Sequence, residues 1–342
     1  MIPSQAIGRG AAIFGCAGPV LLAAERDFFR DYDPFGFIVF ARNVETPEQL
    51  RRLTGDLRDA VGRDAPVLVD QEGGRVQRLR APHWREWQPP FDTVAGFARV
   101  EDAARAMELR SAIMAAELRA VGIDANCSPV ADVARAETHP FLKNRCYGID
   151  PAVVSTIARA VADAWLAGGV LPVVKHMPGH GLSVMDTHHD LPTVRVGREV
   201  LGQVDFAPFR ALADLPMAMT AHIVFADYDD RPATQSPRMI GVIREEIGFA
   251  GLLMTDDLNM EALRGKLASR TAASMAAGCD IALHCKGDLA QMAEVAGAAG
   301  EMGPETRARA AAALAMRRAA PQVDIAALEA DLAALGGGNL HV

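Results

Sequence analysis

The sequence has no hydrophobic stretch that could cross a membrane and no excess of basic residues. None of its apolar runs reaches the roughly 18 residues that a membrane-spanning helix requires. Its 35 Lys and Arg residues are outnumbered by 43 Asp and Glu residues, which gives a formal net charge of −8 at pH 7. Nonspecific nucleic-acid binding depends on a basic surface, so this function is disfavoured. We therefore expect neither a membrane nor a nucleic acid as a partner.

Cysteine is scarce, and its spacing argues against both a disulfide framework and a zinc ribbon. The five cysteines are odd in number and include no C-x-x-C pair: Cys16, Cys127, Cys146, Cys279 and Cys285. In a chain of this size the pattern predicts reduced, buried thiols and a cytoplasmic protein. Residues 13–16 loosely resemble a lipoprotein cleavage site, but only Arg9 precedes them as a basic residue and Pro19 interrupts the apolar segment. We therefore interpret this segment as part of the fold.

The sequence does contain a large apolar fraction, arranged in short strand-like runs. Half of the 342 residues are hydrophobic, which is enough for a sizeable core. The predicted strands are Gly10–Cys16, Phe35–Phe40, Pro66–Val69, Ile123–Cys127, Leu171–Val174, Met217–Thr220, Leu252–Thr255 and Asp280–His284. Residues 37–40 and 251–254 are apolar without alternation, as in a parallel sheet covered on both faces. Helical patterns separate the strands, so we predict an α/β fold, a single-domain (β/α)8 barrel rather than an open doubly wound sheet.

The helical segments begin at recognisable signals. Apolar residues at helical spacing mark Glu101–Val121, Pro151–Ala167 and Arg264–Ala277. Thr46-Pro47 and Asp150-Pro151 each place a capping residue before a proline at the first helical position. The Ala-rich segment after Pro304 predicts one or two further helices. We expect residues 1–303 to form the barrel and residues 304–342 a C-terminal helical extension packed on it, in a monomeric protein.

Charged and polar residues gather where the predicted strands end. Residues 70–75 follow the third strand, residues 175–181 follow the fifth, His222 lies near the end of the sixth, and Asp256-Asp257 follow the seventh. In an α/β barrel the loops at the carboxyl ends of the strands build the active site. Carboxylates and a lysine in one pocket can form paired hydrogen bonds to hydroxyl groups. This end of the barrel therefore predicts a site for an uncharged ligand rich in hydroxyls, such as a sugar.

The segment 175–192 is long for a connection between a strand and a helix. Residues 178–181, with the sequence Pro-Gly-His-Gly, cannot be helical. Asp186 and His188 are two residues apart, so the carboxylate can orient the imidazole and set its tautomer. The pair is therefore a candidate general acid/base, and a solvent-exposed polar loop is the plain alternative.

A metal site is the competing interpretation of the same segment. Ligand types suited to first-row metals occur within it at His176, His180, Asp186, His188 and His189. The sequence has neither a His-x-His motif at the end of the first strand nor a His-Glu-x-x-His motif. We therefore expect no metal and no cofactor, and a metal-dependent amidohydrolase stays an alternative.

Four motifs, in this order along the chain, are similar to those of one known family. They are Val69-Asp70-Gln71-Glu72-Gly73-Gly74-Arg75-Val76-Gln77-Arg78, Lys175-His176-Met177-Pro178-Gly179-His180-Gly181, Asp186-Thr187-His188 and Thr255-Asp256-Asp257-Leu258-Asn259-Met260. Together they resemble the glycoside hydrolase family 3 β-N-acetylglucosaminidases, in particular the single-domain bacterial enzymes of cell-wall recycling. The resemblance spans roughly residues 10 to 290, and its departures at Cys146, Met177 and Thr187 change no reacting group.

The resemblance implies a (β/α)8 barrel that removes a terminal β-linked N-acetylglucosamine with retention of configuration. It places the nucleophile on Asp256 and the acid/base on His188, with Asp186 as the partner of that histidine. The sugar-binding positions that it implies are Asp70, Arg78, Arg145, Lys175 and His176. A histidine, with an ordinary pKa of about 6.5, can both donate and accept a proton near neutrality, as the two steps of a retaining mechanism require.

The substrate is also an implication of the resemblance. It would be a muropeptide that carries N-acetylglucosamine on anhydro-N-acetylmuramic acid, in peptidoglycan recycling and cell-wall biogenesis, or a chitobiose-like compound. A phosphorylase is an alternative, because a histidine acid/base has no negative charge to repel phosphate as the acceptor. A sugar-binding barrel without activity is a third interpretation.

Overall fold

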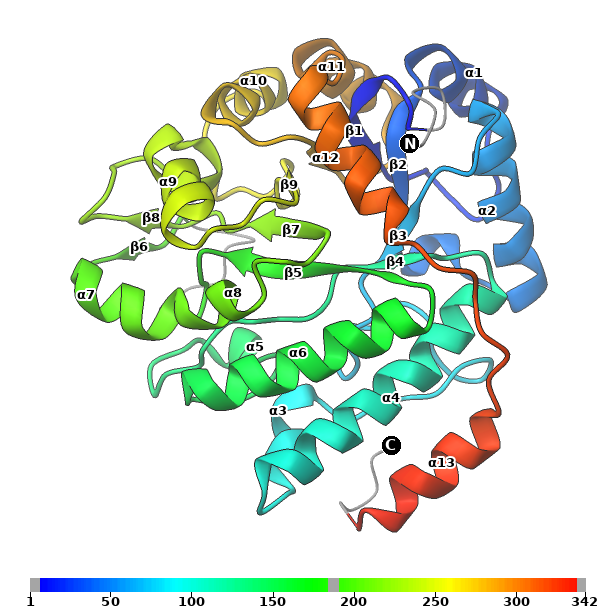
Figure 1. Cartoon of the computed structure of the whole chain (residues 1–342). Coiled ribbons are helices and arrows are strands. Elements are labelled where there is room, and N and C mark those ends of the chain that lie inside the picture. Colours follow the sequence, from blue (N-terminus) through cyan, green and yellow to red (C-terminus); the bar gives the residue numbers. More distant parts are fainter. Residues whose placement is uncertain (1–6, 184–190, 337–342) are drawn as a thin grey trace.

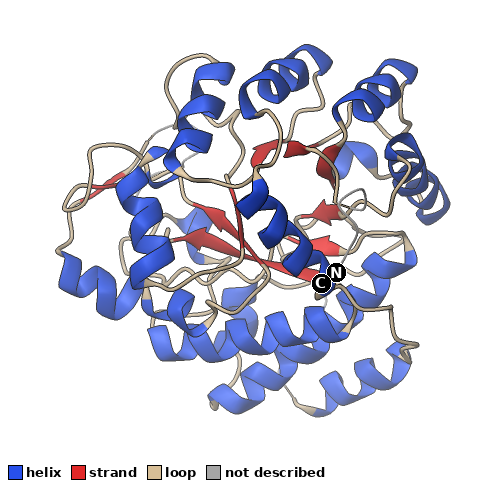
Figure 2. Ribbon diagram, turned by 45° about the horizontal axis from the view of Figure 1, so that its top comes forward, coloured by secondary structure: helices blue, strands red, loops and turns tan. Residues whose placement is uncertain are grey.

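The computed structural model describes residues 7–183 and 191–336 of the chain. Its centre is a sheet of eight parallel strands in the order β10-β1-β2-β3-β4-β5-β7-β9 (Figure 1). A parallel bridge between Met254 and Ile281 links the two ends of this order, so the sheet nearly closes on itself. The helices surround the strands on the outside, as Figure 2 shows. The predicted (β/α)8 barrel is therefore confirmed.

The strands of the barrel begin within two residues of their predicted starts. They are β1 (Gly10–Phe14), β2 (Pro34–Val39), β3 (Val67–Val69), β4 (Ala125–Asn126), β5 (Leu171–Met177), β7 (Met217–Thr220), β9 (Leu252–Met254) and β10 (Ala282–His284). The largest difference is in β5, which continues beyond its predicted end at Val174 because Met177 still pairs with Thr220. The short strands β6 (Thr193–Val194) and β8 (Val224–Phe225) pair with each other outside the barrel. The sequence did not predict them, since two residues show no periodicity.

The helices connect successive strands and cover the outside of the barrel. The α-helices are α1 (Ala23–Tyr32), α2 (Pro47–Val61), α3 (Pro90–Ala95), α4 (Val100–Ala120), α5 (Pro140–Lys143), α6 (Pro151–Ala167), α7 (Arg198–Val200), α8 (Ala207–Ala211), α9 (Pro237–Gly241), α10 (Leu267–Ala277), α11 (Leu289–Ala299), α12 (Pro304–Ala315) and α13 (Ile325–Ala334). The described residues also form the 3₁₀ turns η2 (Ala41–Asn43) and η4 (Ala233–Gln235) and the π-helical turns η3 (Leu201–Asp205) and η5 (Val242–Glu246).

The predicted capping signals act as expected. The Thr46 hydroxyl accepts a hydrogen bond from the backbone N–H of Gln49 at the start of α2. The Asp150 carboxylate accepts from the first turn of α6, which begins and ends at its predicted residues. Helix α10 starts three residues later than predicted, because Gly265 adopts a φ of +90° and keeps the preceding residues in a turn.

Two hydrophobic layers hold the barrel together. The outer layer lies between the strands and the surrounding helices and includes Phe37, Val69 and Val174. The inner layer fills the barrel with the alternate side chains of the same strands, such as Ile38 and Leu68. Alternation of side chains along each strand explains why one short apolar run supplies both layers.

Helix α12 closes the amino-terminal end of the barrel. Its residues Ala310, Ala313 and Leu314 belong to the inner hydrophobic layer. The Arg309 side chain forms an ion pair of 2.8 Å with Asp280, which lies two residues before the start of β10. Helix α13 instead packs on α4, on the outside of the barrel (Figure 1). The predicted division into a barrel and an extension at residue 304 stays a prediction.

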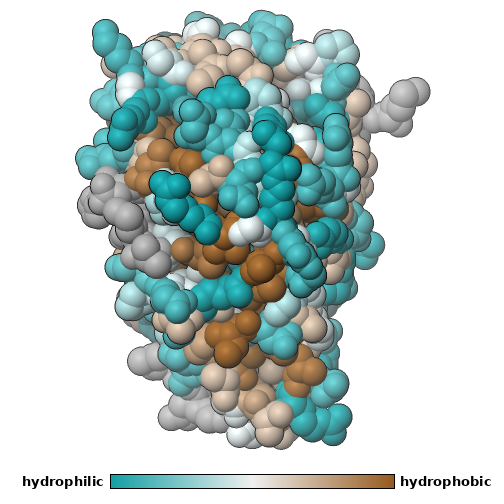
Figure 3. Space-filling view, turned by 90° about the vertical axis from the view of Figure 1, so that its left-hand side faces the viewer, coloured by the Kyte–Doolittle hydropathy of each residue, from teal (hydrophilic) through white to brown (hydrophobic). Residues whose placement is uncertain are grey.

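The surface and the cysteines agree with the composition. Figure 3 views the side of the molecule on which β6 and β8 lie, and hydrophobic side chains gather there among hydrophilic ones. Within residues 7–183 and 191–336, no helix combines the length and the apolar character needed to cross a bilayer. All five cysteines are free thiols, and only Cys285 is partly exposed, as their spacing predicts.

Candidate active site

A cavity of about 230 Å³ opens at the carboxyl ends of the barrel strands. Apolar side chains of β2, β7 and β10, namely Ile38, Met219 and Leu283, line its inner part. Charged and polar side chains that follow β3, β5 and β9 also line the cavity, together with Arg145 and further apolar residues such as Phe40 and Phe141. The cavity therefore lies where the polar residues at the predicted strand ends converge.

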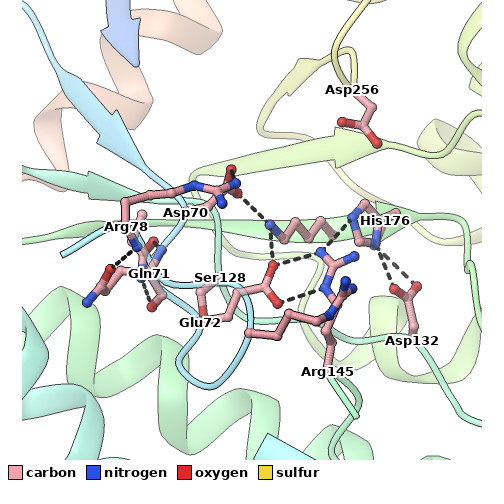
Figure 4. A network of polar contacts seen from close by, with 12 residues as sticks. Asp70, Gln71, Glu72, Arg78, Ser128, Asp132, Arg145, His176 and Asp256 are labelled. Atoms are coloured by element: carbon pink, nitrogen blue, oxygen red, sulfur yellow. Dashed lines mark hydrogen bonds and ion pairs between the residues drawn. The ribbon is translucent and has the colours of Figure 1, made fainter. Parts of the chain in front are cut away.

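Asp70, which follows β3, lies at the centre of a charged network (Figure 4). Its carboxylate accepts hydrogen bonds from Lys175 Nζ at 2.8 Å and from Arg78 Nη2 at 2.9 Å. Burial by itself would raise the pKa of Asp70, but the two cations outweigh burial and lower it. The carboxylate is therefore ionised at neutral pH, with its position fixed by both partners.

Glu72 extends this network by two residues along the same loop. Lys175 Nζ lies 2.6 Å from one carboxylate oxygen, and Arg145 donates to both oxygens at 2.7 and 2.9 Å. Burial opposes ionisation of Glu72, but Arg145 and Lys175 lower its pKa to about 2. The next residue, Gly73, has a φ of +93°, and a Cβ there would lie 1.7 Å from the Arg110 guanidinium. This position therefore accepts only glycine.

His176 reaches the network from the end of β5. Neighbouring residues of a strand normally face opposite sides, but the pairing of β5 with β7 shifts register between Val174 and Met177, and both Lys175 and His176 line the cavity. His176 Nδ1 lies 2.7 Å from Asp132 Oδ2, and its Nε2 lies 3.4 Å from Arg145. An arginine can only donate, so Nε2 accepts and Nδ1 carries the proton.

Asp256 follows β9 and faces the network from another strand (Figure 4). Its Oδ1 accepts a hydrogen bond of 2.8 Å from the backbone N–H of Asp257. No hydrogen bond from the described residues reaches its Oδ2. Burial would raise the pKa of Asp256, but His222 and His176 lower it below its ordinary value. The carboxylate is therefore ionised, with one oxygen available to a ligand.

The neighbouring carboxyl group has the opposite electrostatic character. Burial, together with the charge of Asp256, raises the pKa of Asp257 to about 6. Its Oδ1 accepts hydrogen bonds from the backbone N–H groups of Asn259 and Cys285, both at 3.2 Å. Of the two adjacent acids, Asp256 is therefore the better nucleophile, because it is ionised over the wider pH range.

The structure brings together most of the residues that the sequence predicts for the site. Those that line the one cavity are Asp70, Arg78, Arg145, Lys175, His176 and Asp256. The predicted acid/base His188 and its partner Asp186 lie outside the described residues. His180, at the start of the same segment, lines the cavity, and its pKa is lowered to about 3 by burial and by the nearby His176.

Three residues of the site have no role predicted from the sequence. Glu72 lies within the quoted motif, and His222 lies near the end of the sixth predicted strand. Asp132 follows the end of the fourth predicted strand, Ile123–Cys127, by five residues. The signal that the three share is a carboxylate or an imidazole shortly after a strand end.

The described residues offer no evident metal centre. Among them, no group of three or more His, Cys, Asp or Glu side chains is arranged to hold an ion. His176, which the metal interpretation included, instead pairs with Asp132 and Arg145. The other members at residues 186–189 lie outside the described part of the chain.

A family description, "Glycosyl hydrolase family 3 N terminal domain", matches residues 22–316 of this chain. The chain belongs to glycosyl hydrolase family 3. It is 36% identical over 291 residues to the "Beta-hexosaminidase" of Bordetella avium (strain 197N), which covers 82% of each chain. It is 37% identical over 284 residues to that of Xylella fastidiosa (strain 9a5c), over 81% of this chain and 84% of the relative.

Solved structures of this family have the same fold. Native NagZ from Neisseria gonorrhoeae matches with a TM-score of 0.82 and 28% identity over 98% of each chain. NagZ from the same organism in complex with N-trifluoroacetyl-D-glucosamine matches with a TM-score of 0.80 and 28% identity, over 96% of this chain and 98% of that one. The predicted family, fold and enzyme class, a glycoside hydrolase similar to β-hexosaminidases, are confirmed.

Proposed function

We propose that this protein is a retaining exo-β-N-acetylglucosaminidase. The observation that carries the proposal is that an ionised carboxylate, Asp256, faces a network of fixed donors and acceptors in a single cavity. A sugar ring needs several directional hydrogen bonds on one side and a nucleophile at its anomeric carbon on the other. The cavity supplies both from different strands of the barrel.

The charged network is suited to hold the hydroxyl groups of a sugar. Asp70 can accept from hydroxyls, while Arg78 and Lys175 can donate to them, and each is already oriented by its partners. At the other end of the network Arg145 adds a donor and His176 Nε2 adds an acceptor. Because these groups are fixed before the ligand binds, little reorganisation is needed when it does.

Asp256 is the proposed nucleophile. Its Oδ2 attacks the anomeric carbon as the bond to the leaving-group oxygen breaks, and a covalent glycosyl-enzyme forms. Water then attacks the same carbon and releases the carboxylate, so that two inversions give retention. The hydrogen bond from the Asp257 N–H to Oδ1 supports this assignment, because it orients the carboxylate and leaves the second oxygen available.

His188 is the proposed acid/base, with Asp186 as the residue that orients it. Both assignments rest on the family resemblance, since these residues lie outside the described ones. In the first step the imidazolium protonates the leaving-group oxygen, and in the second the neutral imidazole takes a proton from the attacking water. No metal or cofactor takes part in either step.

The proposed substrate carries a terminal β-linked N-acetylglucosamine. Support comes from the relatives named beta-hexosaminidase and from the matching NagZ structure that holds N-trifluoroacetyl-D-glucosamine. We further propose a muropeptide of peptidoglycan recycling, or a chitobiose-like compound, as the natural substrate. The cytoplasmic location and the monomeric state stay predictions.

The decisive experiment combines hydrolysis with trapping of the intermediate. We expect cleavage of 4-nitrophenyl N-acetyl-β-glucosaminide but little cleavage of the glucoside or galactoside. A 5-fluoro N-acetylglucosaminyl fluoride should label the peptide that contains Asp256, as read by mass spectrometry. Asp256→Ala should lower kcat/KM about 1,000-fold or more, while the matched variant Asp257→Asn still accepts the label.

The same assay separates the alternatives. Labelling of Asp257 would reassign the nucleophile, and the absence of any adduct would contradict the double displacement. If release of sugar 1-phosphate replaced release of the free sugar when phosphate is added, the protein would be a phosphorylase. Release of acetate with the glycosidic bond intact would indicate an amidohydrolase.

A further inference from the structure

We propose that His222 is a positioning residue that fixes the nucleophile Asp256 through the backbone of Asp257. This inference rests on the proposed function, in which Asp256 is the nucleophile and His222 has no part. His222 lies two residues beyond the end of β7, and its exposed fraction is 0%. It therefore cannot contact a substrate and must act through its neighbours.

Both nitrogens of the His222 ring are engaged. Nε2 lies 3.1 Å from the carbonyl oxygen of Asp257, and Nδ1 lies 2.8 Å from the Thr234 hydroxyl. A carbonyl oxygen can only accept, so Nε2 carries a proton and donates it to Asp257. The ring thus links the β7–β8 segment to the residue that follows the nucleophile.

The protonation state of His222 Nδ1 follows from the donors and acceptors around it. Burial lowers the pKa of His222, which favours the neutral ring. The Thr234 hydroxyl lies 2.8 Å from Nδ1, 3.0 Å from the Ala221 carbonyl and 2.9 Å from the Thr220 hydroxyl, and it has one proton to donate. With a neutral ring that proton goes to Nδ1, and the Thr220 hydroxyl can donate to Thr234.

Asp257 takes part in four hydrogen bonds, two at its backbone and two at its side chain. Its carbonyl accepts from His222, and its side chain accepts from the N–H groups of Asn259 and Cys285. Its own N–H donates to Asp256 Oδ1 at 2.8 Å. The Asp257 carbonyl shares its peptide plane with the Leu258 N–H, which donates to the Leu283 carbonyl at 3.1 Å, so this plane cannot rotate without losing a hydrogen bond. The preceding peptide plane, which carries the N–H that orients the nucleophile, joins it at the Asp257 Cα. His222 therefore acts on the direction of that N–H through this Cα, by holding the plane that follows it.

The consequence concerns the reaction rate more than ligand binding. Only Asp256 Oδ2 is left without a hydrogen bond from the described residues, so it is the oxygen presented to the anomeric carbon. A displacement of about 1 Å of a reacting group can cost on the order of 100-fold in rate. No hydrogen bond or ion pair joins His222 to the network around Asp70, so the affinity of that network for a sugar should be kept.

The test compares two substitutions of this one side chain. His222→Gln retains an N–H donor at about the reach of Nε2, whereas His222→Leu fills the space without a donor. For 4-nitrophenyl N-acetyl-β-glucosaminide we expect His222→Leu to lower kcat about 10- to 100-fold, with KM changed less than about threefold. His222→Gln should recover most of kcat. The rate of labelling of Asp256 by the 5-fluoro sugar should follow kcat in both variants.

Two further measurements separate positioning from folding. Thermal melting of the three proteins reports whether each variant folds, and Thr234→Val removes the distal donor while leaving His222 in place. The acid limb of the pH–rate profile should move to higher pH in His222→Leu, because the Asp257 N–H, whose hydrogen bond lowers the pKa of Asp256, is then held less firmly against Oδ1. His176, Lys175 and Asp257, which also face that carboxylate, are unchanged in every variant.

The outcomes are distinct. A folded His222→Leu variant with wild-type kcat and labelling rate would overturn the inference, as would equal losses in the Leu and Gln variants. A loss confined to KM would also overturn it. If the wild-type protein gave no adduct at Asp256, the proposed function itself would fail, whatever these variants did.

Discussion

At the scale of single residues, the cavity is built from charges that fix one another. Asp70 and Glu72 share Lys175, and Arg78 and Arg145 complete their coordination. Burying such charges costs free energy unless each is paired, and removal of one partner leaves the others buried without a counter-charge. The network therefore constrains which side chains the site tolerates. In return its donors and acceptors are already in place for the sugar that we propose as the ligand.

His284 is an ionisable residue that, unlike these charges, is buried without a partner among the described residues. Its exposed fraction is 0%, and within the described residues neither ring nitrogen has a hydrogen-bond partner. Burial lowers its pKa to about 4, against about 6.5 in an unfolded chain. Between these values the unfolded chain binds a proton that the folded protein does not. The free energy of unfolding should therefore fall as the pH is lowered through this window, by at most about 1.4 kcal/mol per pH unit from this residue.

We predict that His284→Phe makes the stability less dependent on pH between 6.5 and 4. The new ring can pack beside Phe14, whose centroid lies 6.2 Å from that of the imidazole. Urea unfolding at pH 7.5, 6.0 and 5.0 gives the free energy of unfolding for both proteins. Other buried histidines, such as His180, affect the pH dependence of both proteins equally. The contribution of His284 is therefore the difference between the free energies of unfolding of the two proteins at each pH. Parallel curves would show that His284 is protonated in the folded state.

At the scale of elements, each helix is specified largely by its own ends. Helix α6 begins after Asp150, whose carboxylate accepts from the N–H groups of Ala152 and Val153 at 2.7 and 3.3 Å. Pro151 then occupies the first turn, where its missing N–H costs nothing. Because these interactions are local, the sequence alone defines the start of the helix.

Loss of the cap should destabilise the protein without changing the site. We predict that Asp150→Ala lowers the free energy of unfolding by about 1 kcal/mol. Thr156→Ala, an exposed substitution inside the same helix, should change it by less than about 0.5 kcal/mol. Urea unfolding measures both, and kcat/KM should be unaltered in each. If Asp150→Ala left the free energy of unfolding unchanged, water would replace the carboxylate as the hydrogen-bond acceptor at little cost.

At the scale of the whole molecule, the two C-terminal helices have different roles. Helix α12 contributes Ala310, Ala313 and Leu314 to the interior of the barrel, and Arg309 binds Asp280 beside β10. Helix α13 covers α4 from outside and fully buries only Leu332 among its own residues. Neither helix contributes a residue to the lining of the cavity at the carboxyl ends of the strands.

This difference predicts unequal effects of truncation. A chain that ends at Gln322 lacks α13 and should stay folded and active, with a Tm lower by roughly 5 °C. A chain that ends at Gly303 lacks α12 as well and should be insoluble or unfolded, because the barrel interior is then open at one end. Circular dichroism and 4-nitrophenyl glycoside hydrolysis report both. A folded, active chain of 303 residues would instead support an independent barrel with a separable extension.

The sequence by itself determined the barrel, the helix caps and the position of most candidate site residues. It could do so because parallel strands in a barrel all present their carboxyl ends on one side, so residues that follow the strands converge without further information. Only the tertiary structure decided which of these residues form hydrogen bonds with one another. Asp132 meets His176 across 44 residues, and His222 meets Asp257 across 35. It also decided that α12 fills the barrel while α13 does not. Such contacts depend on how distant segments approach in space, and local periodicity carries no record of that approach.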